Sequence, residues 1–291
     1  MPGASGETRD AAAEGQQSLL VEKFGDHVLH VTLNRPDRLN AVDRPMRAEL
    51  VTLWQRVKQR TDIRAIVVTG AGSRAFCVGM DLKSLVADGG FPEVPERLAD
   101  HVGINPLRHQ LWTPFVVAVN GVCTGAGLQL VADADVVVAS TNASFLDTHV
   151  SVGQVSALEP IALVPRIGLG RTLKMCLLGK EGRIDAEEAL RIGLVDELVA
   201  PEELHERSLA VARQISAASP NAVRLTKQAI RQSAQRPQAE AEQYGWDLLR
   251  RHRGHPDAME GPRAFVEGRP PSWSDAWLET ERNGENGDHG D

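Results

Sequence analysis

The sequence has few cysteines and no long apolar run. Its three cysteines stand far apart, without the CxxC or CxxH spacing of a zinc site: Cys77, Cys123 and Cys176. A disulfide framework or a structural zinc is therefore not expected, and a reducing compartment fits best. No apolar run approaches the roughly 20 residues of a membrane-spanning helix, and the polar start of the chain lacks the apolar centre of a signal peptide. These absences predict a cytoplasmic protein without a membrane or metal partner, whose residues 1–17 form a disordered leader.

An excess of positive charge is also missing. The formal net charge is −7, which argues against nucleic acid as the main partner. The glycine patterns of common phosphate-binding loops, GxGxxG and GxxxxGK[ST], do not occur. What is present is a chain of 291 residues, 42% of them hydrophobic. A chain of this length can bury a sizeable core in one large or two smaller domains.

The hydrophobic pattern predicts an α/β core followed by a helical C-terminal part. Residues 18–24 and 27–33 are typical of a β-hairpin, and residues 45–59 have the period of an amphipathic helix. Strands and helices then alternate as far as the strand "DVVVAS". Beyond it, one short strand is expected in "GLVDELV", and helices are expected over residues 157–176, 185–192, 201–217, 219–251 and 256–266. The polar tail, residues 276–291, has nothing to bury and is expected to be disordered.

Two glycine-containing loops follow buried strands. In the first, "AFCVGMDL", Gly79 permits a sharp turn that aims neighbouring amides outward. In the second, Gly125-Ala126-Gly127 opens a helix, so unpaired N–H groups and the positive end of the helix dipole point at one spot. Two such amides can hold a developing oxyanion, and losing one donor typically costs ~2.7–4 kcal/mol. The alternative reading is tight packing at a strand–turn–helix junction.

Four motifs in one order carry a family resemblance. They are "LNRPDRLNAV", "GSRAFCVGMDL", "VAVNGVCTGAGLQLVADADVVVAS" and "GRIDAEEALRIGLVDELV". The series closely resembles the crotonase superfamily, the enoyl-CoA hydratase/isomerase family, over residues 18–273. The resemblance implies an α/β fold with a spiral of ββα units over residues 18–200 and a helical trimerisation part over residues 201–275. It also implies a homotrimer or dimer of trimers that acts on acyl-CoA thioesters, with no cofactor except the coenzyme A of the substrate.

The resemblance assigns the oxyanion hole and the CoA contacts. In the family, the thioester carbonyl sits between two backbone amides, which here fall on Met80 and Ala126. Ala126 stands where the family usually has glycine and keeps the amide. The CoA-contacting positions match Arg38, Leu39, Asn40, Ala41, Val78, Asp81, Leu82 and Lys83. Arg38 or Lys83 could pair with phosphates, although either could equally be a solvated surface charge.

A further CoA contact is implied near the C-terminus. The run "RAFVEGRPP" resembles the segment in which a phenylalanine, here Phe265, approaches the CoA of a neighbouring subunit. The family commonly has a lysine three residues later, where this chain has Gly268. Arg269 could take over its phosphate contact.

The chain departs from the hydratase pattern at the acid positions. Hydratases of the family use two glutamates that flank one water, and these positions fall on Gln129 and His149. An amide can orient a water or a carbonyl group, but it cannot take up a proton. The resemblance therefore implies that hydration by two glutamates does not occur here.

Three side chains are candidates for the base. His149 stands where the family's base stands, and an ordinary pKa of about 6.5 suits a general base near neutral pH. Asp147 could orient the imidazole or meet the substrate itself, and Glu159 lies near the start of the next helix, where the family's loop faces the acyl pocket. Each also has a structural explanation, as a hydrogen-bonded histidine, a turn residue or a helix-start acid.

The sequence does not decide between several reactions. Hydration, isomerisation, C–C bond hydrolysis and thioester hydrolysis all occur on the family's scaffold. The alternative from another class is an acyl-CoA-binding protein with little turnover. The sequence does not identify the acyl group.

Overall fold

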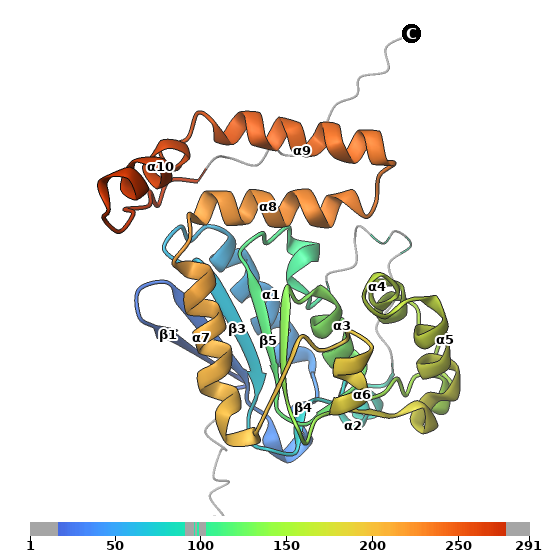
Figure 1. The fold of residues 1–291 in the computed structure, drawn as a ribbon. Coiled ribbons are helices and arrows are strands. Elements are labelled where there is room, and N and C mark those ends of the chain that lie inside the picture. Colours follow the sequence, from blue (N-terminus) through green and yellow to red (C-terminus); the bar gives the residue numbers. More distant parts are fainter. Residues whose placement is uncertain (1–16, 91–95, 97, 99–102, 278–291) are drawn as a thin grey trace, which may run out of the picture.

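The computed structural model describes residues 17–90, 96, 98 and 103–277. Residues 1–16 of the predicted leader and residues 278–291 of the predicted tail lie outside the described residues. Within them the strands form two sheets (Figure 1). The large sheet has the order β1-β2-β3-β5-β7-β10, with bounds Leu19–Phe24, Val28–Leu33, Ala65–Gly70, Phe115–Val119, Val136–Ser140 and Glu197–Val199. The small sheet has the order β4-β6-β8-β9, with bounds Ala75–Cys77, Val122–Cys123, Ser144–Phe145 and Ile184–Asp185.

A ββα pattern repeats along the chain. The predicted hairpin is confirmed, because β1 and β2 pair antiparallel and lead to α1 (Arg44–Lys58). Strands β3 and β4 then precede α2 (Leu82–Ala87), and β5 and β6 precede α3 (Ala126–Asp133). Each of these later pairs sends its first strand to the large sheet and its second to the small sheet, and β2, β3, β5 and β7 pair in parallel. The α/β spiral of ββα units expected from the sequence is confirmed.

Helices cover both faces of the large sheet. Successive strand residues point to opposite faces, so Ile66 and Val68 pack toward α1 while Ala65 and Val67 pack toward α7 (Leu204–Ser216). Helix α1 begins at the Asp43 cap and buries a single stripe of its surface: Met46, Leu50, Trp54 and Val57. Helix α7 follows the predicted boundary at residue 200, yet it packs on the large sheet (Figure 1).

The C-terminal part is helical, but two predicted helices are wrong as continuous elements. Residues 157–176 divide into α4 (Leu158–Ile167) and α5 (Leu169–Leu178), because Gly168 adopts φ 80° between them. Residues 219–251 divide at Pro237, which precedes α9 and cannot continue a helix from α8. The helices after α5 are α6 (Ala186–Arg191), α7, α8 (Pro220–Ser233), α9 (Gln238–His252) and α10 (Asp257–Glu267).

The strands of the small sheet are a further correction. The sequence predicts a loop around β4 and no strand at β6, β8 or β9. These strands have two or three residues each, which is too short for a hydrophobic period to appear. Short 3₁₀ turns also occur, over Pro36–Arg38, Pro106–His109, Val150–Val152, Gly179–Gly182 and Pro201–Glu203.

A buried lysine fastens α8 to the core. Lys227 Nζ lies 2.7 Å from the Asp135 carboxylate and donates to the Thr113 carbonyl at 3.0 Å. Arg231, one turn later, donates to the backbone carbonyls of Asp133 and Ala134. The α8–α9 hairpin is therefore held against the C-terminal end of α3, whose N-terminal end carries the candidate site. In the described part of the chain, no helix has the length and apolar character needed to span a bilayer.

Candidate active site

The two glycine loops meet backbone to backbone. A Cβ atom at Gly125 would lie 3.1 Å from the Gly79 Cα atom, and a Cβ at Gly79 would lie 3.6 Å from the Ala126 nitrogen. Both glycines have positive φ, 89° at Gly79 and 53° at Gly125, a conformation that side chains disfavour. Glycine at both positions therefore brings the residues that follow them, Met80 and Ala126, to one place.

The backbone amides of Met80 and Ala126 are both available. A parallel bridge joins Met80 to Val42, but it uses the Gly79 carbonyl and the Asp81 amide, so the Met80 N–H points away from Val42. Ala126 is the first residue of α3, where an amide has no partner within the helix. Within the described residues neither amide has an acceptor. Two free donors at the contact of two loops are what an oxyanion hole requires.

His149 lies beside this contact and is paired with Asp147. A Cβ at Gly125 would lie 3.8 Å from the His149 Cε1 atom. His149 donates to Asp147 Oδ1 from its backbone nitrogen at 2.9 Å, and its Nδ1 lies 3.0 Å from the same oxygen. The Asp147 side chain is fully buried, whereas 27% of the His149 side chain is exposed. The imidazole is therefore fixed on its inner side and accessible on its outer side.

Each partner changes the pKa of the other. Burial raises the pKa of Asp147, but hydrogen bonds from His149 and Ser156 outweigh it, so the pKa lies below its ordinary value. The hydrogen bond to Asp147 raises the pKa of His149, burial opposes the rise, and the charges of Asp147 and Glu159 add to it. Asp147 is thus a carboxylate near neutral pH, and the pKa of His149 lies above its ordinary value.

Glu159 and Gln129 are the other predicted polar residues of the site. Glu159 is in the first turn of α4, is half-buried, and is close enough for its charge to act on the imidazole. Gln129 is buried in the second turn of α3, and its side-chain amide has no hydrogen-bond partner in the described part of the chain. The structure therefore brings together the three base candidates and the predicted oxyanion amides.

The two predicted CoA segments lie against each other. The Val42 amide donates to the Gly79 carbonyl at 2.8 Å, and the Asp81 amide donates to the Val42 carbonyl at 3.0 Å. Arg35 adds ion pairs of 2.9 Å with Asp81 and 3.1 Å with Asp43. The Asp81 carboxylate also accepts from the first backbone amides of α2, so it is engaged within the protein. The sequence analysis did not predict these ion pairs of Arg35, although Arg35 is part of the motif "LNRPDRLNAV".

The remaining predicted CoA residues divide into buried and exposed ones. Asn40 is fully buried, and its side chain joins two loops. Its Oδ1 accepts from the Arg35 backbone amide, and its Nδ2 donates to the Ala71 and Ala75 carbonyls. Ala41 is also buried, Val78 and Leu39 are half-buried, and Arg38, Leu82 and Lys83 are exposed. A cavity of about 350 Å³ opens beside Arg38 and Arg35. It could receive a polar group of a ligand.

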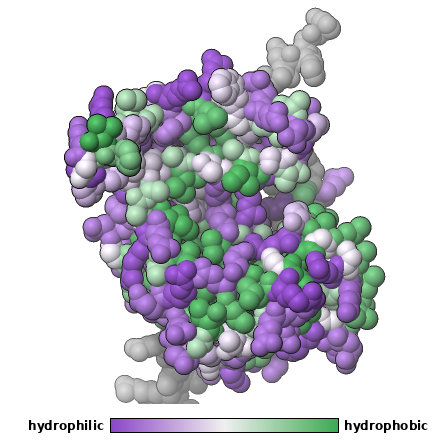
Figure 2. Space-filling model, viewed as in Figure 1, coloured by the Kyte–Doolittle hydropathy of each residue, from purple (hydrophilic) through white to green (hydrophobic). Residues whose placement is uncertain are grey.

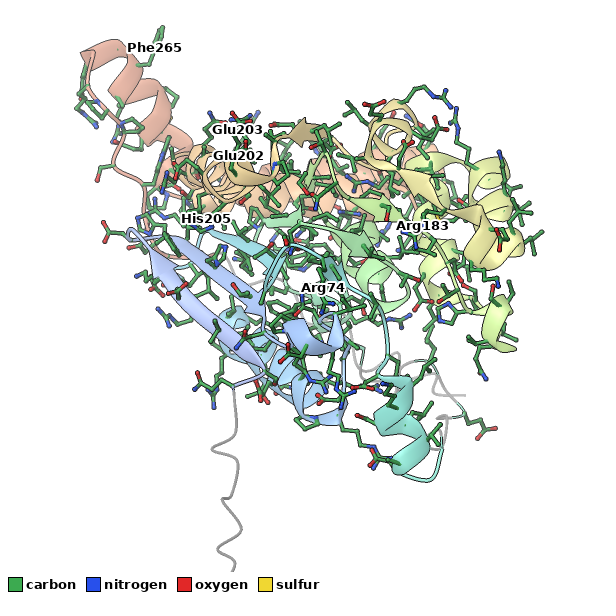
Figure 3. The ribbon with its side chains drawn as sticks, turned by 90° about the horizontal axis from the view of Figure 1, so that it is seen from below. Arg74, Arg183, Glu202, Glu203, His205 and Phe265 are labelled. Carbon is green, nitrogen blue, oxygen red and sulfur yellow. The ribbon has the colours of Figure 1, made fainter. Side chains whose placement is uncertain are left out.

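Phe265 is not brought to this site within one chain. Its side chain is 87% exposed, and in Figure 3 it projects from the end of α10 away from the body of the chain. Arg269 pairs with Glu260 and Glu267 on the same helix, so its guanidinium is already engaged.

Ser156 is the second functional residue that the sequence analysis missed. Its hydroxyl donates to Asp147 Oδ2 at 2.7 Å. The two residues are nine positions apart, in a segment without helix or strand period, so no local pattern announces the contact.

Comparisons with known proteins identify the family of this chain. The pattern of the enoyl-CoA hydratase/isomerase family matches residues 23–276. The (E)-benzylidenesuccinyl-CoA hydratase of Thauera aromatica is 37% identical over 262 residues, which cover 87% of this chain and 98% of that protein. The carnitinyl-CoA dehydratase of Proteus mirabilis is 32% identical over 266 residues, covering 88% and 98%.

A solved structure shows the same likeness. The crystal structure of an enoyl-CoA hydratase/isomerase from Mycobacterium paratuberculosis superimposes with a TM-score of 0.81 at 36% sequence identity, covering 89% of this chain and 99% of that one. The chain is a member of the enoyl-CoA hydratase/isomerase family.

Proposed function

We propose that this enzyme catalyses the reversible addition of water to a substituted 2-enoyl-CoA, with His149 as its base. The observation that carries the proposal is the Asp147–His149 pair beside the contact of Gly79 and Gly125. A base next to two free amides can move a proton at Cα while the amides hold the negative charge that develops on the thioester oxygen. Two relatives named as a hydratase and a dehydratase support this type of reaction.

His149 has two successive proton transfers in this mechanism. Nε2 takes a proton from water as the water oxygen bonds to Cβ, and the electrons of the double bond move to the thioester oxygen. The amides of Met80 and Ala126 donate to that enolate oxygen. The imidazolium then returns the proton to Cα, and the thioester carbonyl re-forms. Asp147 stays ionised and stabilises the imidazolium between the two transfers.

Gln129 and Glu159 have supporting roles in the proposal. The side-chain amide of Gln129 is free to hold the attacking water, since it can both donate and accept. Glu159 adds negative charge near the imidazole, which favours the protonated form that must return the proton. Neither role requires a second base.

The substrate is proposed to carry more than a short alkyl chain. The names of the two relatives point to a benzylidenesuccinyl and a carnitinyl group. A single base typically contributes about 10²–10⁴-fold to the rate, and this site has one base where hydratases have two carboxylates. Additional binding energy from a larger acyl group would compensate for the rate that the missing group would supply. We therefore expect slow hydration of crotonyl-CoA and faster hydration of 2-enoyl-CoA thioesters with an aryl or charged substituent at Cβ.

CoA binding and assembly complete the proposal. Segments 38–41 and 78–83 would hold the CoA, with Arg38 and Lys83 as exposed phosphate ligands. Figure 2 shows hydrophobic side chains on the surface over α4 and α5, and exposed apolar residues also occur on α8–α10: Ile230, Trp246, Leu249, Phe265 and Val266. Such faces fit a homotrimer or dimer of trimers in which Phe265 reaches a neighbour's CoA, and sedimentation velocity at micromolar concentration tests that assembly.

The experiment for the reaction compares substrates. The purified enzyme is mixed with crotonyl-CoA and with a 3-aryl-2-enoyl-CoA, and loss of the conjugated thioester is followed by absorbance, with the product identified by mass. Faster formation of the 3-hydroxyacyl-CoA from the aryl substrate is expected. Tight binding of both thioesters without turnover of either would contradict the proposal and favour an acyl-CoA-binding protein.

A further inference from the structure

We propose that Ser156 is a positioning residue that fixes the Asp147 carboxylate and thereby selects which nitrogen of His149 acts as the base. The inference rests on the proposed role of His149. It concerns a residue to which neither the family resemblance nor the relatives' names assign a part.

The two oxygens of Asp147 have separate partners. Oδ1 accepts from the His149 backbone amide at 2.9 Å and lies 3.0 Å from His149 Nδ1. Oδ2 accepts from the Ser156 hydroxyl at 2.7 Å. Because the Asp147 side chain is fully buried, water has no access that would let it replace a lost partner. Ser156 therefore prevents rotation of the carboxylate that would take Oδ1 away from the imidazole.

This arrangement determines the tautomer of His149. An ionised carboxylate can only accept hydrogen bonds, so Nδ1 must carry the hydrogen that points at Oδ1. The lone pair of the neutral imidazole is then on Nε2, the nitrogen that has no partner in the described structure. A rotated carboxylate would leave the ring free to populate the other tautomer, in which Nε2 carries hydrogen and cannot accept a proton.

The Ser156 hydroxyl does not cap the helix that follows it. A serine just before a helix usually caps it by accepting from the first backbone amides. Helix α4 begins after Ala157, and no side chain caps it. The Ser156 hydroxyl points instead to the carboxylate nine residues earlier. Its role is thus directed to Asp147 and not to the helix.

Other titratable groups lie close to Ser156 and the Asp147–His149 pair. The titratable groups that act on this cluster are Asp147, Glu159 of α4 and Cys176 of α5. Burial raises the pKa of Cys176 to about 11, the charges of Asp147 and Glu159 add to the rise, and its hydrogen bond with Ser156 opposes it. Cys176 is therefore a neutral thiol at physiological pH, and it lies within hydrogen-bonding reach of Ser156, which helps to place the hydroxyl.

The test uses three serine variants of the full-length enzyme. Ser156→Ala removes the hydroxyl, and Ser156→Thr keeps it. Ser151→Ala is the matched control, because the exposed Ser151 hydroxyl accepts from the Lys180 amide in the same segment and does not touch Asp147. Each variant is measured twice, by kinetics on the best 2-enoyl-CoA substrate and by NMR titration of the His149 imidazole, assigned with His149→Gln.

We expect Ser156→Ala to lower kcat about tenfold with little change in KM, the effect of one lost hydrogen bond behind the base. The titration midpoint of His149 should move down toward its ordinary value, because the bond to Asp147 that raises it is weakened. Ser156→Thr should restore both quantities, and Ser151→Ala should leave both unchanged.

Two results would overturn the inference. One is a Ser156→Ala enzyme with wild-type kcat and an unchanged His149 midpoint. The other is a loss of rate without any movement of that midpoint, which would indicate a merely structural role. The NMR titration tests whether Ser156 affects the pKa of His149, and it does so without any measurement of turnover. A His149→Ala enzyme with wild-type rate would instead remove the proposed base and leave the Ser156 result interpretable.

Discussion

Gly79 and Gly125 lie in backbone contact, with 3.1 Å between the Gly79 Cα atom and the position of a Cβ at Gly125. The contact joins a loop that follows the small-sheet strand β4 to the first turn of α3. It brings the backbone of Met80, which follows Gly79, close to the amide of Ala126. The site is thus built from backbone first, and the side chains of His149 and Asp147 are added at its edge.

The first prediction removes one of these amides. Ala126→Pro deletes the N–H group, and proline is well tolerated at the first position of a helix. Loss of one oxyanion donor should lower kcat by about 10²–10³-fold while CoA binding changes little. Steady-state kinetics and titration with free CoA measure the two effects.

A control separates this effect from misfolding. Leu169→Pro places proline at the first position of α5, which also follows a glycine and is exposed. It should keep wild-type activity. A folded Ala126→Pro enzyme with full activity would remove Ala126 from the oxyanion hole.

The second prediction concerns pH. A base must be neutral, so kcat/KM should rise with pH through the pKa of His149 and then level off. Because the hydrogen bond to Asp147 is the main cause that raises this pKa, the midpoint of the rise should lie above 6.5, the ordinary histidine value. Asp147→Asn should move the rise to lower pH and reduce the plateau by about 10²–10⁴-fold, since an amide also permits the wrong tautomer.

The control for this variant is another aspartate. Asp185→Asn changes a helix cap outside the site, and asparagine caps as well as aspartate, so its pH profile should match that of the wild type. A profile of Asp147→Asn that superimposes on the wild type would show that the pair does not govern the base.

The third prediction concerns stability in acid. His30 in β2 is buried, and its ring packs edge to face against Phe24 and His205. Burial, with a smaller contribution from His205, lowers the pKa of His30 to about 4. Between pH 6.5 and 4, the His30 side chain is protonated in the unfolded chain and neutral in the folded chain. The contribution of neutral His30 to the free energy of unfolding is therefore full above about pH 6.5 and is lost as pH falls toward 4. The loss amounts to about 3 kcal/mol.

Urea unfolding at several pH values checks this expectation. The free energy of unfolding of the wild type should fall between pH 6.5 and 4.5, and His30→Leu should show a smaller fall over the same interval. Equal acid sensitivity in both proteins would mean that His30 does not titrate in this way.

The fold was predictable where sequence periods are long. The hairpin over residues 18–33 and the helix over residues 45–59 have clear patterns, and both elements are present. Strands of two or three residues, such as Val122–Cys123, are too short to show a hydrophobic period. They form because distant segments of the chain pair with them in the small sheet. The break at Pro237 had a local signal, since proline disfavours a continuous helix, whereas the break at Gly168 depends on its positive φ.

The site was predictable where it consists of backbone. Strand, glycine turn and helix follow one another in the sequence. This order predicts that the loops with Gly79 and Gly125 expose backbone N–H groups. The long-range ties could not be identified. Arg35 meets Asp81 across 46 positions, and Ser156 meets Asp147 only because the intervening segment folds back. Such contacts depend on tertiary packing and leave no local pattern.

The central claim is that His149 moves a proton at Cα of a CoA thioester. Deuterium incorporation from D₂O at Cα of an acyl-CoA measures this step without reference to the overall reaction. The account predicts enzyme-catalysed exchange that falls by about 10²–10⁴-fold in His149→Ala, and by less in Gln129→Ala, since an amide can only position. Unchanged exchange in a folded His149→Ala enzyme would contradict the account and move the base to Glu159 or Asp147.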